Sequence, residues 1–369
     1  AGCGGAEERK AKYLERATAY FEEENYDKAR IEFKNVLQID PKTAAPYYYI
    51  GRIEESAQEW RKAFDKYSKA VELDPDLLDA RVRLGRFYLL AGQPDKAQEE
   101  IDAVLTKEPE NADALSLRAS MLFRSDKADE AVAMLQGVLD RDPGHEGSAI
   151  MLANIFKQQE KGAESIAVLE QASAGNSESV PLQTNLIRFY LEQKQNDKAE
   201  AMMTGLVKNQ PDELQYRITL ASFYAQTGRN DEAEAVLREA IAADPEDTQR
   251  YLLLADFLKQ KHGSERAISE LQSSIAAQPD MTELRFALAS QYLQAEQKDK
   301  AEAEYRTLID EQGVEPAGLK ARTAIALLRV QDGKPDEAKV LLEEVLKENP
   351  KDSQALMLSG RIALSEKAW

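Results

Sequence analysis

The sequence has little of what enzymes and membrane proteins require. It contains one cysteine and two histidines in 369 residues, which excludes an internal disulfide and provides no zinc-binding constellation. It has no run of 18 apolar residues, which argues against a transmembrane helix within these residues. A Gly-rich phosphate loop, a nucleophile elbow and a paired metal-ligand motif are also absent. We therefore expect a protein that is not an enzyme, with no metal, no cofactor and no small-molecule substrate.

Positive charge is also scarce. The chain has 48 Lys and Arg against 66 Asp and Glu, a net charge of −18. This balance argues against nucleic acid as a partner, because phosphate binding needs concentrated cations. Aromatic residues make up only 7%, and Ala, Leu, Glu, Lys, Gln and Arg dominate, as in all-helical proteins.

Proline recurs with a period of 34 residues. The prolines in register are Pro41, Pro75, Pro109 and Pro143, then Pro211, Pro245 and Pro279, and finally Pro316 and Pro350. Self-similarity at this period predicts stacked helix–turn–helix repeats rather than one globular core.

Small residues mark two positions of every repeat. With the proline at position 32, the repeats begin at residues 10, 44, 78, 112, 146, 180, 214, 248, 282 and 319, and a half repeat begins at 353. Position 20 reads Ala29, Ala63, Ala97, Ala131, Ser165, Ala199, Ala233, Ala267, Ala301 and Ala338. Position 8 is mostly Ala or Gly, as in Ala17 and Gly51, while Ile187 is an exception. Two antiparallel helices cross closely only where side chains are small.

Turn residues separate the expected helices. Gly92-Gln93-Pro94-Asp95 lies between the two helices of a repeat, since Gly suits a helix end and Asp the start of the next. Asp74-Pro75 lies between repeats, because the residue before proline avoids the α region. Each repeat is therefore a helix, a short turn, a second helix and a proline break.

These features resemble the tetratricopeptide repeat (TPR) family. The small residues at positions 8 and 20, the aromatic residues at position 11 and the proline at position 32 follow its pattern over about residues 10–369. The resemblance implies an all-α, right-handed superhelical solenoid of about ten and a half repeats. It also implies a concave groove lined by the first helix of each repeat.

We divide the chain into three segments. The first segment, residues 1–9, is interpreted as the remnant of a lipobox (a bacterial lipidation signal) followed by a tether. The second, residues 10–179, holds repeats 1–5. The third, residues 180–369, holds repeats 6–10 and the first helix of an eleventh. The fifth repeat is weakest, with Ser165 at position 20 and Ser177 where proline belongs. We expect either a hinge near 173–180 or a degenerate repeat of ordinary rigidity.

Two further departures from the period occur late in the chain. Extra residues near 310–316 predict a longer loop. Trp369 falls in mid-repeat, so we expect either that the natural polypeptide continues or that Trp369 partly covers the last helix.

Cys3 is the candidate lipidation site. Ala1-Gly2-Cys3 fits the last three positions of a bacterial lipobox, and Gly4 after the cysteine resembles lipoproteins of an outer membrane. Lipid on Cys3 would anchor the protein to the outer membrane, with the repeats in the periplasm. Alternatively, Cys3 is an incidental thiol and the protein is cytoplasmic.

The predicted binding surface follows positions 5, 9 and 12 of the first helices. Its candidate residues are Tyr48, Arg52, Val82, Arg86, Leu89, Phe123, Asn154 and Arg188. The same positions include Ile218, Ser222, Asp256, Phe286, Leu327 and Arg361. Arg52 and Arg86 are one repeat apart and could each donate two hydrogen bonds to a carboxylate. The Lys/Asn carboxylate clamp of some family members is not reproduced, because Asn154 is paired with Ile150. His145 and His262 are expected in solvent-exposed turns.

The leading functional hypothesis is a non-enzymatic scaffold that binds a protein or peptide in the groove. Residues 29–38 are similar to repeat lipoproteins found beside exosortase and exopolysaccharide systems. This resemblance suggests a role in assembling a secretion or polysaccharide-export complex. The alternatives are a cytoplasmic adaptor, or the docking arm of a larger protein with further sequence beyond Trp369.

Overall fold

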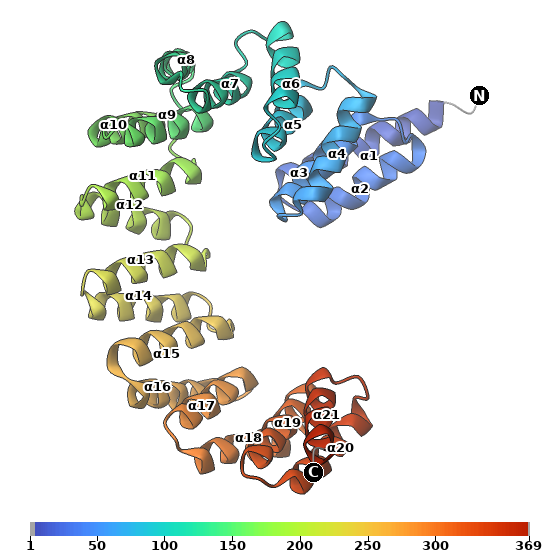
Figure 1. The fold of residues 1–369 in the computed structure, drawn as a ribbon, viewed down its shortest axis with the longest axis vertical. Coiled ribbons are helices and arrows are strands. Elements are labelled where there is room, and N and C mark those ends of the chain that lie inside the picture. The colour runs from blue at the N-terminus through green and yellow to red at the C-terminus, as the bar shows by residue number, and fades with distance from the viewer. Residues whose placement is uncertain (1–3, 368–369) are drawn as a thin grey trace. The chain divides into compact units, whose positions relative to one another are not determined.

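The computed structural model describes residues 4–367, which form 21 helices and contain no strand (Figure 1). The first helices of the repeats are α1 (Gly4–Glu22), α3 (Ala44–Ser56), α5 (Leu78–Leu90), α7 (Ala112–Arg124), α9 (Glu146–Gln158), α11 (Val180–Glu192), α13 (Leu214–Gln226), α15 (Thr248–His262), α17 (Thr282–Gln294), α19 (Pro316–Gln331) and α21 (Ser353–Lys367). The second helices are α2 (Tyr26–Ile39), α4 (Trp60–Leu73), α6 (Pro94–Lys107), α8 (Ala128–Arg141), α10 (Gly162–Gly175), α12 (Asn196–Asn209), α14 (Asn230–Ala243), α16 (Ser264–Ala277), α18 (Lys298–Gln312) and α20 (Pro335–Glu348). The predicted all-α repeat solenoid is confirmed.

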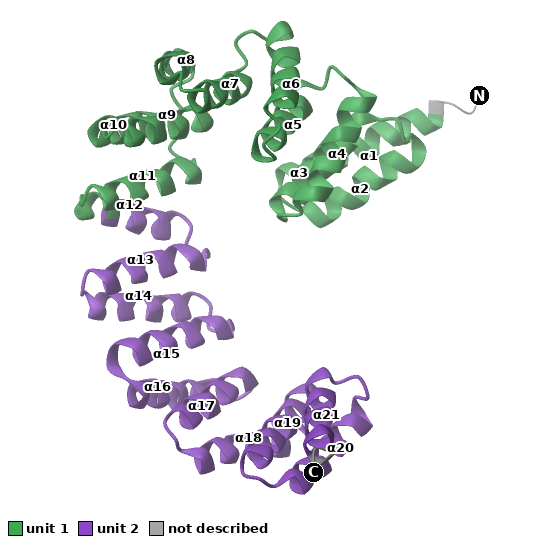
Figure 2. Cartoon of the chain, in the orientation of Figure 1, with its two compact units in different colours: residues 1–199 green, residues 200–369 purple. Residues whose placement is uncertain are grey.

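The helices divide between two compact units, which we call unit 1 (residues 1–199) and unit 2 (residues 200–369) (Figure 2). The division falls inside α12. Apart from α12, where the two units divide, each second helix packs against its own first helix and against the next one. Several successive first helices also touch, such as α7 with α9 in unit 1 and α19 with α21 in unit 2.

The small residues form the helix crossings, as predicted. Ala29, Ala63 and Ala97 at position 20 are completely buried, as is Ala119 at position 8. The side chains that surround them are the large residues of position 24, among them the fully buried Phe33.

The Asp-Pro pairs hold the turns between repeats. Asp40 Oδ1 accepts a hydrogen bond from the amide of Lys42 at 3.0 Å, and Asp74 Oδ1 accepts one from the amide of Asp76 at 2.9 Å. An aspartate that bonds the backbone two residues on fixes a turn, so the pair both ends the helix and shapes the connection.

The first helix begins earlier than the repeat frame predicted. Helix α1 starts at Gly4, so residues 4–9 of the expected tether are helical. Lys10 pairs with Glu7 at 2.8 Å, and Lys12 pairs with Glu8 at 2.8 Å. Such pairs three and four residues apart stabilise a helix start, which explains the difference. Cys3, the predicted lipidation site, and Trp369 lie outside the described residues.

The fifth repeat keeps regular geometry despite its sequence. Buried Ser165 donates from its hydroxyl to the carbonyl oxygen of Ala153 at 2.9 Å, so it replaces alanine without an unsatisfied group. The connections on either side approach closely, because a Cβ on Gly175 would lie 3.0 Å from the amide nitrogen of Gly144. The hinge near 173–180 stays a prediction.

The extra residues of the ninth repeat lengthen helices rather than a loop. Helix α18 has 15 residues and α19 has 16. Gly313 ends α18 with a φ of 56°, a conformation that favours glycine. Pro316 begins α19 at the position where proline costs no hydrogen bond. The expectation of a longer loop was therefore wrong.

Candidate polypeptide-binding surface

Three predicted groove residues are buried in unit 1. Tyr48, Val82 and Leu89 are only 8%, 5% and 6% exposed. Val82 packs with Ile101 and other buried apolar residues of the adjacent helices. The three side chains therefore contribute mainly to packing in unit 1, and their contact with a partner stays a prediction.

The predicted arginines of unit 1 are partly exposed. The Arg52 guanidinium lies 4.6 Å from the ring centroid of Phe21 and 5.9 Å from that of Tyr48, a cation–π arrangement. Arg86 lines an open cleft of about 620 Å3. Phe123 is half-buried beside the core of repeats 4 and 5. The pairing of Arg52 with Arg86 stays a prediction.

Asn154 and Arg188, both at position 9, meet in the structure. Arg188 donates to Asn154 Oδ1 at 3.3 Å and to Asn185 Oδ1 at 2.8 Å. Its guanidinium also lies 4.8 Å from the ring centroid of Phe189. Equivalent positions of consecutive repeats are therefore neighbours, as the 34-residue frame implies.

His145 is not the exposed turn residue that the sequence suggested. Its side chain is 15% exposed. Its Nδ1 accepts from the amide of Ser148 at 3.2 Å and caps α9, while Nε2 lies 3.5 Å from the carboxylate of Asp113. This contact is the main cause that holds the pKa of the Asp113 carboxyl below its usual range, and the nearby charges of Arg86 and Arg83 act in the same direction. His262, by contrast, is exposed at the end of α15.

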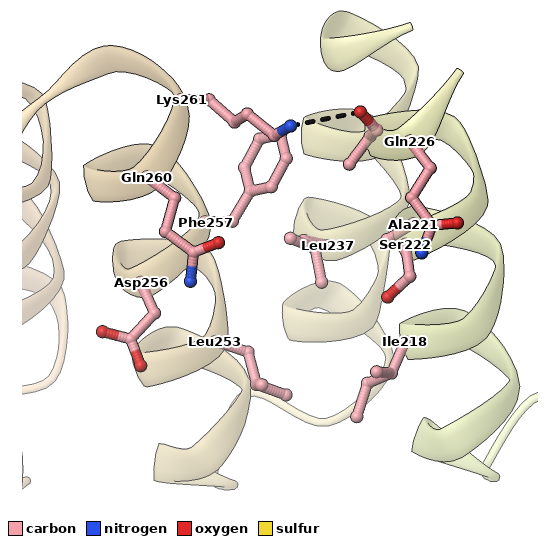
Figure 3. Close-up of a pocket in the computed structure, with 11 residues that line it drawn as sticks. Ile218, Ala221, Ser222, Gln226, Leu237, Leu253, Asp256, Phe257, Gln260 and Lys261 are labelled. Carbon is pink, nitrogen blue, oxygen red and sulfur yellow. Dashed lines mark hydrogen bonds between the residues drawn. The ribbon is translucent and has the colours of Figure 1, made fainter. Parts of the chain in front are cut away.

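Unit 2 has a cleft of about 410 Å3 between α13 and α15, which we call the α13–α15 cleft (Figure 3). Ile218 of α13 and Leu253 of α15 point toward each other across it, and Phe257 forms an apolar wall. The exposed side chains of Ser222 and Asp256, both at position 9, lie along its opening. The cleft therefore offers apolar contact together with hydrogen-bonding groups, as sites for polypeptides generally do.

Lys261 closes one end of the α13–α15 cleft. Its Nζ donates to the carbonyl oxygen of Ala225 at 3.1 Å (Figure 3). The last carbonyls of a helix have no partner within the helix and carry partial negative charge, so Lys261 satisfies the end of α13. Arg124 does the same for α5 in unit 1, where it donates to the carbonyl oxygen of Leu89 at 3.1 Å.

The repeat frame found part of this site. Ile218, Ser222 and Asp256 stand at positions 5 and 9. Phe257 and Lys261, at positions 10 and 14, fall outside the predicted set. A sequence signal could have found them. Phe257 is a large apolar residue directly after the polar position 9, and the cation Lys261 follows four residues later.

Repeated helix pairs with small residues at each crossing define the chain as a helical-repeat solenoid. Four family models, each for a form of the tetratricopeptide repeat, match it. The model of the TPR domain of cytochrome c-type biogenesis protein H matches residues 6–146, and general tetratricopeptide repeat models match residues 156–218, 214–257 and 323–369. The chain is a tetratricopeptide repeat protein.

Several solved structures are similar to this chain over different lengths. A structure of Naa15/Naa10 bound to HypK-THB is 14% identical with a TM-score of 0.50, over 98% of this chain and 67% of that one. PilF of Pseudomonas aeruginosa is 17% identical with a TM-score of 0.42, over 59% of this chain and 99% of its own. A thermophilic TPR protein of Thermus thermophilus is 23% identical with a TM-score of 0.34, over 49% of this chain and 98% of its own. No curated protein matches the sequence.

Proposed function

We propose that this protein is a non-enzymatic scaffold that holds a polypeptide segment of a partner against the first helices of unit 2, in the α13–α15 cleft. The observation that carries the proposal is the composition of this cleft. Apolar Ile218, Leu253 and Phe257 meet between two first helices, while Ser222 and Asp256 stay exposed beside them. A side chain of the partner would lie against the apolar wall, and its backbone would bond the polar groups.

Random-peptide display on the purified chain tests this proposal. Ser222→Arg places a long side chain in the cleft. Ser269→Arg makes the same change at an exposed site of α16, away from the cleft. We expect a group of selected peptides that binds Ser222→Arg at least about tenfold more weakly than wild type, because the cleft is filled.

Ser269→Arg should bind those peptides as wild type does. A selection that enriches no peptide, or peptides that bind both variants equally, would contradict the proposal. The double variant Arg52→Glu and Arg86→Glu tests the surface predicted for unit 1 in the same assay. Weaker binding of a selected peptide would place that peptide on unit 1.

The finer parts of the hypothesis concern location and pathway. We propose that lipid on Cys3 holds the scaffold at the periplasmic face of a bacterial outer membrane, where it assists a secretion or exopolysaccharide-export complex. The support is the Ala1-Gly2-Cys3 sequence and the similarity of residues 29–38. Mass spectrometry of the membrane-extracted protein should find an acylated cysteine, and an unmodified Cys3 would overturn the anchor.

A second candidate role comes from the family model that matches residues 6–146. That model describes a TPR domain of a cytochrome c-type biogenesis protein, so the partner of this scaffold could belong to an assembly of that kind. Deletion of the gene tests this role. A changed cytochrome c content together with an unchanged amount of exopolysaccharide would favour a role in cytochrome c biogenesis over a role in polysaccharide export.

A further inference from the structure

A second pocket of unit 2 has features that the scaffold role does not use. It measures about 320 Å3 and is lined by α17, α18, α19 and α21. Phe286, Leu327 and Leu358 give it an apolar interior. Lys320 and Arg361, both exposed, lie at its rim. We call it the α19–α21 pocket.

Among the side chains that the structure describes, the two rim cations have no carboxylate partner, although the protein carries a net charge of −18. Neighbouring cations are paired: Arg322 lies 3.2 Å from Glu344, and Arg329 lies 2.5 Å from Glu302. The only interaction of Lys320 within the described residues is with the ring of Phe286, whose centroid lies 4.3 Å from its Nζ. A pair of uncompensated cations on an acidic protein marks a place where anionic groups are attracted.

Tyr305 of α18 gives the pocket a hydrogen-bond donor. Its side chain is 7% exposed and lines the pocket, and its hydroxyl has no partner among the described residues. Two other buried tyrosines of unit 2 have hydroxyl partners: Tyr224 donates to Glu200 at 3.0 Å, and Tyr292 accepts from the side-chain amide of Gln272 at 2.8 Å. A phenol hydroxyl without a protein partner is free to donate to an acceptor that a ligand supplies.

The positions of the two cations indicate the shape of the ligand. Lys320 stands at position 2 of its repeat and Arg361 at position 9 of the next, on two first helices that touch. Seven residues along a helix amount to about 10 Å, so the two charges are staggered with the apolar interior between them. Two acidic side chains on either side of an apolar one match such an offset, because alternate residues of an extended chain face the same way, about 6–7 Å apart.

We propose that the α19–α21 pocket binds an extended partner segment in which an apolar side chain is flanked, two residues away on each side, by acidic side chains. The apolar side chain lies against Phe286, Leu327 and Leu358. The carboxylates pair with Lys320 and Arg361, and the Tyr305 hydroxyl donates to an acceptor of the segment. This inference rests on the proposed scaffold role but concerns a different surface.

The test uses the full chain and a fluorescent peptide with blocked ends and the core Glu-Ser-Leu-Ser-Glu, measured by fluorescence anisotropy. Comparison peptides carry Gln-Ser-Leu-Ser-Gln and Glu-Ser-Ser-Ser-Glu. We expect the first peptide to bind at least about tenfold more tightly than either comparison peptide. Equal binding of the glutamine peptide would overturn the proposal.

Protein variants locate the binding. Lys320→Glu with Arg361→Glu should weaken binding at least about tenfold. Lys208→Glu with Lys351→Glu makes the same charge change at two exposed lysines outside the pocket and should leave affinity within about twofold of wild type. Equal effects of the two double variants would overturn the site.

Tyr305→Phe removes only the hydroxyl. We expect about 2- to 12-fold weaker binding, the range for one hydrogen bond, without a lower Tm because no bond within the described residues is lost. Unchanged affinity would overturn the role of Tyr305. Ser222→Arg should not change the affinity for this peptide, because it alters only the α13–α15 cleft. The experiments can therefore reject the scaffold proposal and the pocket proposal independently of each other.

Discussion

At the scale of single residues, the helix crossing explains why position 8 is glycine in the second repeat. A Cβ on Gly51 would lie 2.7 Å from Cε1 of Tyr67. That ring is completely buried, and its hydroxyl donates to Glu55 at 2.6 Å. The ring cannot move without breaking this contact. At Gly85, the corresponding Cβ would meet Ile101 at 3.5 Å, which is an ordinary contact.

We therefore predict opposite effects of one substitution at equivalent positions. Gly51→Ala should lower the free energy of unfolding by about 1–2 kcal/mol, because overpacking exceeds the gain in helix propensity. Gly85→Ala should be neutral or raise it by up to about 1 kcal/mol. Chemical denaturation of both variants measures the difference. If Gly51→Ala is as stable as wild type, Tyr67 does not restrict position 8.

At the scale of elements, α18 and α19 are joined by a two-bond ion pair. Arg329 donates to the two carboxylate oxygens of Glu302 at 2.5 and 2.8 Å, and Arg306 donates to the same carboxylate at 2.6 Å. The bonds from Arg329, followed by those from Arg306, hold the pKa of the Glu302 carboxyl below its usual value despite partial burial, which acts in the opposite direction.

The lowered pKa of Glu302 predicts a pH dependence of stability. Its contribution is present above the pKa of an unfolded glutamate, about 4.3, and is lost as the pH falls through the lower pKa of the folded state. Glu302→Gln should cost about 1 kcal/mol at pH 7, since solvent screens the pair. This corresponds to roughly 2–4 °C in Tm for a unit of this size.

Thermal unfolding measured between pH 2 and 7 tests this. The difference in Tm between wild type and Glu302→Gln should shrink as the pH falls below about 4. Glu239→Gln changes an exposed carboxylate of α14 that makes no ion pair among the described residues, and it serves as the control. A constant difference across this range would show that Glu302 acts through packing and not through charge.

At the scale of the whole molecule, the repeats divide the tasks of stability and binding. Each repeat contacts only its neighbours, so the crossings and turns that stabilise one repeat are independent of the surface that a distant repeat presents. Both candidate sites of unit 2 lie where side chains of successive first helices converge. A scaffold of this kind can hold two segments of a partner at once, which raises the effective concentration of the second segment.

The sequence by itself determined the period, the helix pairs, the buried alanines and the Asp-Pro turns. Each depends on residues close in the chain or one repeat away, and spacing reveals them. The tertiary structure alone decided which groove positions stay open. Tyr48, Val82 and Leu89 are buried, whereas Ser222 and Asp256 are exposed at the opening of a cleft. It also decided that His145 caps α9 and that the hydroxyl of Tyr305 is left without a partner among the described residues. The physical reason is that exposure depends on how closely successive first helices pack, and a repeating pattern of residue types does not specify that separation.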